Sequence, residues 1–240
     1  MNQVLNKTSA LASRDISGME RAEVLRELRE ALREKSTEHR ELSGSSRVPT
    51  GIADLDRLLL GGFQRGTLTT ITGHWAVGKT SLALSSLVQL CSEGFPVAIV
   101  DVSGNLFPPV LADMGAALER VLWVRSDSRR AVWAAEQILR SGIFNGVLLL
   151  DPALSRGRGV FQWSRAMLRR LQLASESANA MTLLVHGSKR GLGGGGNLCV
   201  RVESLMEGRA SAPKGILASE RLAEVSVSRG AISGRVVVDL

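Results

Sequence analysis

From residue 50 onward, the apolar residues fall into short continuous runs that alternate with helix-like segments. Runs without strict alternation are typical of strands buried on both faces of a parallel sheet. Strands are expected at 67–72, 97–102, 121–124, 146–151 and 181–186, and a short helix is expected before Gly61-Gly62. The pattern predicts an α/β fold with a mostly parallel sheet flanked by helices.

The last residues of the chain show a different pattern. The stretches 223–227 and 232–238 alternate between apolar and polar residues, and Gly230 lies between them. Two alternating runs around a glycine are typical of an antiparallel hairpin. We therefore expect a globular core over 50–240 that closes with a β-hairpin at about 221–240.

The N-terminal part carries a separate amphipathic signal. Residues 1–16 are polar and unpatterned, and we expect them to be flexible. Ser17 and Glu20 have the spacing of a capping box, which opens a helix predicted over 17–41. One apolar stripe on this helix includes Val24, Leu25, Leu28 and Leu32. The stripe packs on the chain's own core or docks on a partner or a second copy. The linker expected at 42–49 favours docking.

Composition and charge narrow the classes of function. The net charge is +7, and 25 arginines accompany 5 lysines. Such a balance is compatible with nucleic-acid contact, although it also fits a protein with an arginine bias. Cys91 and Cys199 lack metal-ligand spacing and read as buried thiols in a reducing compartment. Neither an apolar run of about 18 residues nor a signal-peptide pattern is found, so we expect a cytoplasmic protein without a membrane partner.

Residues 73–80 complete the pattern GxxxxGK[ST] between an expected strand and an expected helix. In this arrangement, loop N–H groups and the helix N-terminus bind phosphate oxygens. The lysine reaches the outer phosphates, and the threonine hydroxyl binds Mg²⁺. The pattern predicts ATP and Mg²⁺ as cofactors. The expected nucleotide-binding residues are Gly73, His74, Trp75, Ala76, Val77, Gly78, Lys79, Thr80 and Ser81.

Two further strands are expected to end in carboxylates. Asp151 follows the apolar run at 146–150, and it would help to orient Mg²⁺ together with Thr80, usually through a water molecule. Asp101 follows the run at 97–100. Asp101 is either a second acidic group near the phosphates or the cap of a helix or turn.

These motifs resemble the opening of a RecA/RadA/KaiC-type ATPase core. The resemblance rests on Thr50-Gly-Ile-Ala-Asp-Leu-Asp56, Gly61-Gly-Phe-Gln-Arg-Gly66 and the phosphate loop. A later similarity to RecA runs from Ser164 to His186. Because the chain is shorter than a recombinase and has a detached N-terminal helix, it is similar to the ImuA group of RecA-related mutagenesis accessories. That resemblance implies a nucleoid-associated role in the SOS response. It also implies three partners: RecA, a Y-family-like polymerase subunit and an error-prone replicative polymerase.

One departure from the RecA pattern concerns hydrolysis. The resemblance places Ser103 where RecA-like ATPases carry the glutamate that orients the attacking water. Serine is no general base at neutral pH, so we expect slow or absent hydrolysis unless Asp101 substitutes. The alternatives are a DNA-dependent ATPase of the RadA or recombinase type and a cell-division inhibitor of the SulA kind. For the inhibitor, the intact phosphate loop has no evident purpose.

Single-stranded DNA is a further candidate ligand. A glycine-rich segment at 188–197 opens with Lys189 and Arg190, and it corresponds to a DNA-binding loop in the recombinase. More arginines follow Asp151, namely Arg156, Arg158, Arg165, Arg169 and Arg170. The same residues also fit a solvated surface. His186, at the end of a strand, is either a sensor of the γ-phosphate or a core histidine.

Overall fold

The computed structural model describes residues 26, 30, 46–74, 76–104, 106–151, 163–187, 198–204, 222–228 and 233–239. The chain divides into two compact units, Met1–Gly44 and Ser45–Leu240. In the first unit only Arg26 and Glu30 are described, and both are helical and exposed. The predictions of a flexible 1–16 segment and of a docking stripe (Val24, Leu25, Leu28 and Leu32) therefore lie outside the described residues.

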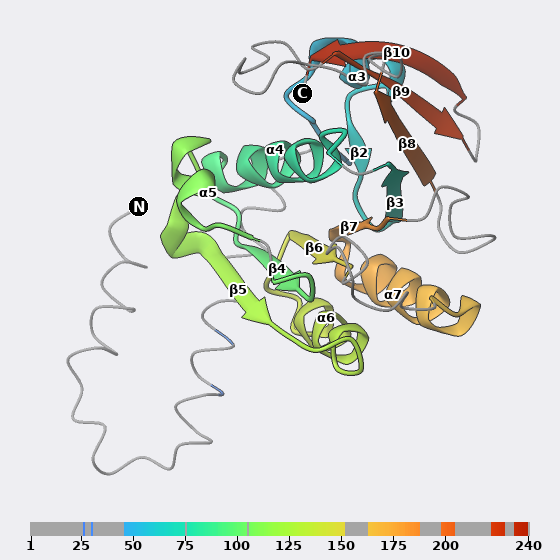
Figure 1. Ribbon diagram of the computed structural model, residues 1–240. Coiled ribbons are helices and arrows are strands. Elements are labelled where there is room, and N and C mark those ends of the chain that lie inside the picture. Colours follow the sequence, from blue (N-terminus) through green and yellow to red (C-terminus); the bar gives the residue numbers. More distant parts are fainter. Residues whose placement is uncertain are drawn as a thin grey trace. The chain divides into compact units, whose positions relative to one another are not determined.

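The described part of the second unit is built on an eight-stranded sheet of order β10-β9-β8-β3-β7-β6-β4-β5 (Figure 1). The strands from β8 to β5 are parallel, whereas β9 pairs antiparallel with both β8 and β10. The strand bounds are β3 Leu68–Gly73, β4 Val97–Asp101, β5 Val121–Arg125, β6 Gly146–Leu150, β7 Met181–Val185, β8 Leu198–Ser204, β9 Leu222–Ser228 and β10 Gly234–Asp239.

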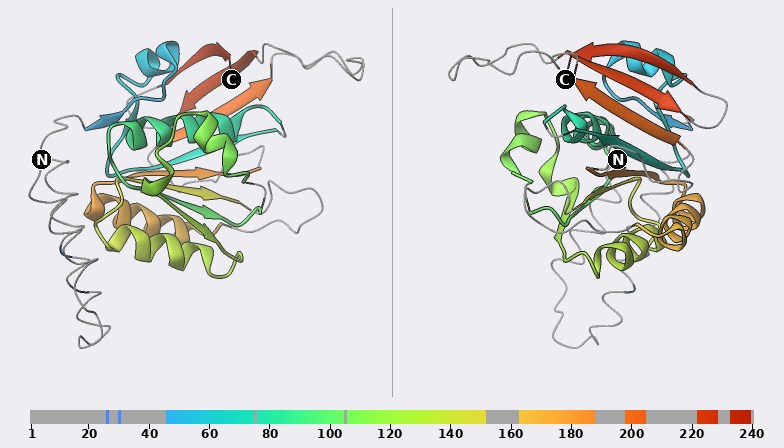
Figure 2. Two further views of the ribbon diagram at one scale, coloured as in Figure 1. Left: turned by 90° about the vertical axis from the view of Figure 1, so that its left-hand side faces the viewer. Right: turned by 45° about the vertical axis from the view of Figure 1, so that its right-hand side comes forward.

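Helices cover both faces of the parallel strands (Figures 1 and 2). Helix α4 (Lys79–Ser92) lies on one face, and α6 (Ala131–Arg140) and α7 (Arg165–Ala178) lie on the other. Alternate residues of β4 accordingly enter two different cores. Val97 and Ile99 belong to the core that contains α4, and Ala98 and Val100 belong to the core that contains α6. Both faces of β4 are thus apolar, which explains its continuous apolar run.

Shorter elements complete the unit. Helix α3 (Ala53–Leu58) packs on β10, α5 (Pro109–Asp113) precedes the 3₁₀ turn η2 (Leu118–Arg120), and β1 (Arg47–Val48) pairs antiparallel with β2 (Phe63–Gln64). The linker prediction for 42–49 was therefore wrong at its end. Val48 and Phe63 are fully buried, and Arg47 Nη1 donates 2.8 Å to the Leu59 carbonyl, so this end of the segment is part of the fold.

The five predicted parallel strands and the C-terminal hairpin are confirmed, with ends that shift by one or two residues. The prediction did not include β8, which pairs parallel with β3 and joins the hairpin to the sheet. None of the described helices has the length and apolarity needed to cross a bilayer.

Candidate nucleotide-binding site

The carboxyl ends of four neighbouring strands carry the predicted site residues. Backbone bonds continue the ladder just beyond the strands. The His186 N–H donates 3.0 Å to the Ile71 carbonyl, and the Asp151 N–H donates 3.0 Å to the Val185 carbonyl. The Val102 N–H donates 3.1 Å to the Leu150 carbonyl. The segments after β3, β7, β6 and β4 therefore meet at one edge of the sheet, where α/β proteins bind ligands.

The loop after β3 leads into the N-terminus of α4. Gly78, at the N-cap, adopts a left-handed conformation with φ 85°, which glycine accepts without steric cost. From the first turn, Lys79 Nζ donates 2.9 Å to the Gly73 carbonyl and also donates to the His74 carbonyl. Trp75, predicted to belong to the loop, lies outside the described residues.

Lys79 is a buried cation. Only 5% of the residue is exposed, and burial lowers the pKa of its ammonium group from 10.5 to about 8. Among the described acidic side chains, none forms an ion pair with it. A desolvated ammonium group whose partners are neutral carbonyls gains strongly from an anionic ligand. The lysine and the N-terminus of α4 therefore suit a phosphate group.

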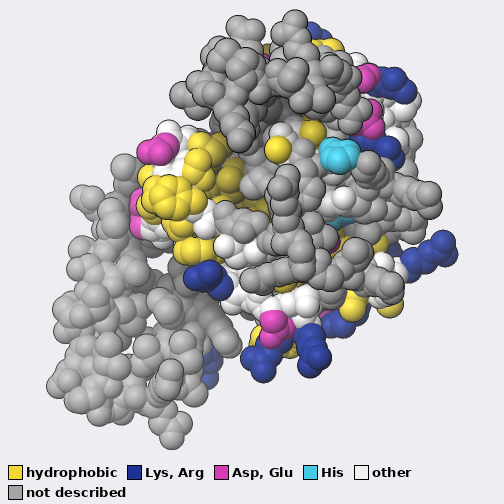
Figure 3. All heavy atoms as spheres, viewed as in Figure 1, with side chains coloured by type: hydrophobic (Ala, Val, Ile, Leu, Met, Phe, Trp, Pro, Cys, Tyr) yellow, Lys and Arg dark blue, Asp and Glu magenta, His cyan; other side chains and the backbone are white. Residues whose placement is uncertain are grey.

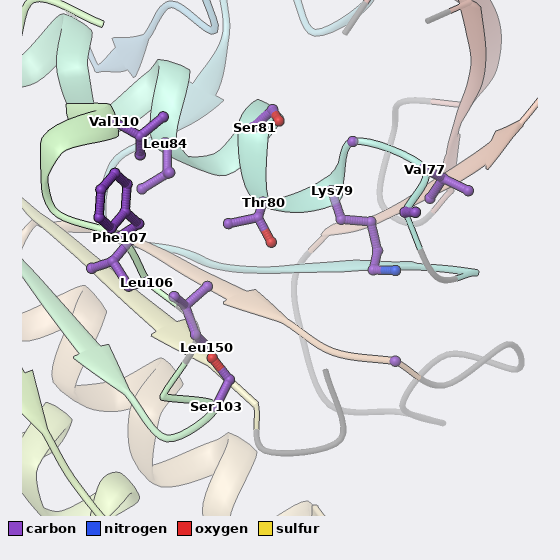
Figure 4. Close-up of a pocket in the computed structure, with 13 residues that line it drawn as sticks. Val77, Lys79, Thr80, Ser81, Leu84, Ser103, Leu106, Phe107, Val110 and Leu150 are labelled. Atoms are coloured by element: carbon purple, nitrogen blue, oxygen red, sulfur yellow. The ribbon is translucent and has the colours of Figure 1, made fainter. Parts of the chain in front are cut away.

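A cavity of about 420 Å³ lies beside this loop, a size typical of small-molecule sites. Figure 4 shows Lys79 and Thr80 at one part of the cavity and a group of apolar side chains at another. The described lining residues are Ala76, Val77, Gly78, Lys79, Thr80, Ser81, Leu84, Ser103, Leu106, Phe107, Val110, Leu150 and Gly187. The cavity thus combines a cationic part with an apolar part, as a nucleotide requires.

The apolar part reaches the surface. Phe107 is 67% exposed, and hydrophobic side chains gather on the face shown in Figure 3. Val110 on α5 and Leu118 on η2 are also exposed. An exposed aromatic side chain beside a phosphate-binding loop can contact the flat face of a nucleoside base.

Asp101 and Ser103 form a closed hydrogen-bond cluster beside the cavity. Ser103 Oγ donates 2.7 Å to Asp101 Oδ1, and the Gly104 N–H donates 2.8 Å to the same oxygen. The Leu106 N–H donates 3.3 Å to Asp101 Oδ2. Asp101 thus caps the turn after β4, which matches the second of the two readings given for it. Its use as a base stays a prediction.

Asp151 is 2% exposed and follows β6, and its neighbour Leu150 lines the cavity. Trp163 Nε1 donates 2.5 Å to Asp151 Oδ2. The described residues contain no cluster of three or more His, Cys, Asp or Glu side chains that could hold a metal by themselves. The donor set of Thr80 and Asp151 fits Mg²⁺, which is usually held by few protein ligands together with phosphates and waters.

His186 follows β7, between the ends of β3 and β6. The residue is 1% exposed, and burial, assisted by the Lys79 cation, lowers the pKa of its imidazole from 6.5 to about 4. The ring is therefore neutral at neutral pH. A neutral ring is compatible with both readings of His186, as a γ-phosphate sensor and as a core residue.

We expect His186 to make the fold sensitive to acid. Between pH 6.5 and 4 the unfolded chain binds a proton that the folded chain does not, so the free energy of unfolding should fall as the pH falls. The expected loss is about 3 kcal/mol across this window. Urea unfolding at several pH values should show a shallower dependence for His186→Asn. An identical dependence in both proteins would refute this cause.

The arginines predicted to contact DNA differ in their surroundings. Arg165 and Arg169 are exposed on the first turns of α7. Arg170 instead pairs with the buried Glu136 of α6, whose other oxygen accepts 2.6 Å from Arg140. This ion pair holds α6 to α7, and DNA contact by Arg170 stays a prediction. Arg156, Arg158, Lys189 and Arg190 lie outside the described residues.

Comparisons with known proteins agree with this geometry. A family model described as "ATPase: KaiC" matches residues 48–105, which include the phosphate loop and Ser103. RecA from Picosynechococcus sp. is 30% identical over 103 residues, which are 42% of this chain and 30% of that protein. RecA from Bacillus subtilis is 31% identical over 106 residues, which are 43% of this chain and 30% of that protein. The match thus spans about 30% of these relatives' length.

A solved structure supports the fold over a longer stretch. The crystal structure of the RadB recombinase superposes with a TM-score of 0.60 and 22% identity, and the match covers 79% of this chain and 94% of RadB. At this identity the likeness concerns the fold. The family-model match and the RecA relatives thus support a similarity to the RecA/KaiC-type P-loop ATPase superfamily, and the likeness to RadB shows that the fold is shared.

Proposed function

We propose that this chain is a RecA-related nucleotide-binding accessory protein of DNA-damage-induced translesion mutagenesis, similar to ImuA. In this proposal it binds MgATP and hydrolyses it slowly or not at all. Its nucleotide state controls its binding to RecA, to a Y-family-like polymerase subunit and to an error-prone replicative polymerase. The observation that carries the proposal is the hydrogen bond from Ser103 to Asp101 at the edge of the cavity.

The expected base position carries the hydroxyl of Ser103 and no carboxylate. The Ser103 hydroxyl faces the cavity but is a donor to Asp101, and Asp101 itself accepts three bonds from the turn. Three donors hold this carboxylate in the turn, so it is not free to rotate toward a water molecule. Loss of a positioned base commonly costs 10²–10⁴-fold in rate, in order of magnitude.

Binding does not need that base. Lys79 and the N–H groups at the start of α4 would hold the phosphates, and the Thr80 hydroxyl with the Asp151 carboxylate would hold the magnesium ion. When bound, the ion neutralises phosphate charge. Phe107 and Val110 would cover the base. The site is therefore suited to a ligand-dependent switch without rapid turnover.

Steady-state hydrolysis of MgATP, with and without single-stranded DNA, tests this proposal. We expect binding in an equilibrium assay but turnover below roughly a few per minute in both conditions, because ordinary enzymes work at about 1–10³ s⁻¹ and the base is missing. Binding of purified RecA should then differ between the ATP-loaded and the nucleotide-free protein. Faster turnover that Lys79→Ala abolishes would contradict the proposal.

A DNA-dependent ATPase of the recombinase type is the second candidate. The exposed Arg165 and Arg169 at the start of α7 favour it, since arginines on one helical turn can contact a phosphate backbone. The likenesses to RecA proteins and to the RadB recombinase point the same way. Strong stimulation of hydrolysis by single-stranded DNA would select this candidate over the first.

A further inference from the structure

Trp163 makes a polar contact that the nucleotide-binding motifs do not include. Its indole Nε1 donates 2.5 Å to Oδ2 of Asp151, across the chain segment between β6 and α7. Asp151 is almost fully buried, and its backbone N–H is already bonded to the Val185 carbonyl at 3.0 Å. Both the backbone and one carboxylate oxygen of this residue are therefore fixed.

A hydrogen bond to one carboxylate oxygen restricts the rotation of the group and thereby the position of the other oxygen. A carboxylate with a free side-chain torsion presents either oxygen to a metal-bound water, and ordering it on binding costs conformational entropy. The indole bond removes part of that freedom before the metal arrives. We propose that Trp163 is a positioning residue that holds the Asp151 carboxylate ready for the magnesium–nucleotide complex. This inference rests on the proposed nucleotide-binding function.

Trp163 is itself well anchored. Its ring packs against the core shared by α6 and α7, as does the side chain of Met167. The next residue, Ser164, is the N-cap of α7, and its Oγ accepts 3.2 Å from the Met167 N–H. The indole therefore links the start of α7 to the Asp151 carboxylate.

The type of side chain matters for this role. Tryptophan provides a single donor on a large rigid ring, so packing alone fixes where its N–H points. Such partners of metal-binding groups commonly contribute 10–100-fold to metal affinity, in order of magnitude. Phenylalanine would keep most of the packing and lose the donor. Trp163→Phe therefore separates positioning from packing.

The experiment is a titration with the fluorescent nucleotide mant-ADP, first in EDTA and then at increasing magnesium concentrations. For Trp163→Phe we expect unchanged affinity in EDTA, within about twofold, and a roughly tenfold higher magnesium concentration for half-maximal enhancement of binding. Trp133→Phe is the matched control, because Trp133 lies on α6 and is 59% exposed. It should behave as the wild type does. Trp163→His retains an N–H donor and should restore part of the magnesium response.

Two outcomes would overturn the inference. One is an unchanged magnesium response in Trp163→Phe, and the other is an equal loss of affinity in EDTA and in magnesium, which indicates damaged packing. If the wild-type protein itself fails to bind mant-ADP in either condition, the proposed nucleotide function fails, and this inference fails with it. The wild-type titration thus distinguishes the two failures.

Discussion

Replacing Lys79 with methionine is expected to weaken the binding of MgATP by roughly a hundredfold or more, without lowering the stability of the unliganded protein. The loss follows because truncating one partner of a buried charge pair costs about 2–5 kcal/mol, and each 1.4 kcal/mol is about tenfold in affinity. Lys79 is the cation at the phosphate part of the cavity, so methionine removes this partner and keeps a similar volume.

The stability of the unliganded protein is expected to stay the same or to rise, although the affinity for MgATP falls. Burial lowers the pKa of Lys79 to about 8, so at neutral pH the empty site holds its charge at a cost of about 3 kcal/mol. Methionine removes that cost, although the Gly73 and His74 carbonyls lose a donor. Isothermal titration calorimetry and urea unfolding of the same preparations check both parts. A large drop in stability would mean that Lys79 supports the fold, and unchanged affinity would remove it from the site.

Replacing Gly73 with alanine is expected to destabilise the fold by about 3 kcal/mol or more. Gly73 ends β3 and pairs with Val202 of β8. Its φ is +149°, and a Cβ atom there would lie 2.1 Å from the Val202 carbonyl oxygen. Backbone would have to move at the place where the phosphate loop leaves the sheet, so nucleotide affinity should fall as well.

Gly115→Ala is the control that separates the cost of a positive φ from the cost of a steric clash. Gly115 also has a positive φ, +89°, but a Cβ there would meet nothing within 4 Å. Its cost should be limited to the backbone term of about 1 kcal/mol. Urea unfolding of both variants gives the comparison. Equal losses of unfolding free energy in the two variants would show that the backbone of β8 at Val202 can move to accommodate a Cβ atom at residue 73.

The sequence was sufficient for the features that repeat a strong local pattern. The residues of β3, β4, β6 and β7 are buried along the whole of each strand because helices cover both faces of the sheet, and each of these strands was found from the sequence. Strand β8 was missed. Within Leu198–Ser204, the charged residues Arg201 and Glu203 interrupt the apolar residues, and a glycine-rich segment precedes the strand. The strand therefore lacks a long apolar run. It is an interior strand of the sheet because it pairs with β3 on one side and with β9 on the other.

Some residues of the candidate site could also be predicted from the sequence, and others could not. The phosphate loop follows a fixed spacing, so the position of Lys79 and Thr80 could be predicted. The role of Asp101 could not, because whether a carboxylate caps a turn or faces a ligand depends on the path of the chain over the next five residues. The contacts of Asp151 with Trp163 and of Arg170 with Glu136 join residues 12 and 34 positions apart, and such distances leave no local signal.

The strand order also has a consequence for how the protein is made. Strand β3 carries the phosphate loop, yet its neighbours β7 and β8 begin only at Met181 and Leu198. In a nascent chain, β3 therefore has no partner in the sheet until β7 has been synthesised, and its second partner follows only with β8. Pairing between such distant segments is slow because the loop-closure entropy is paid first. Strand β3, whose residues are all buried in the folded protein, thus stays open to chaperones and to aggregation until β7 is available.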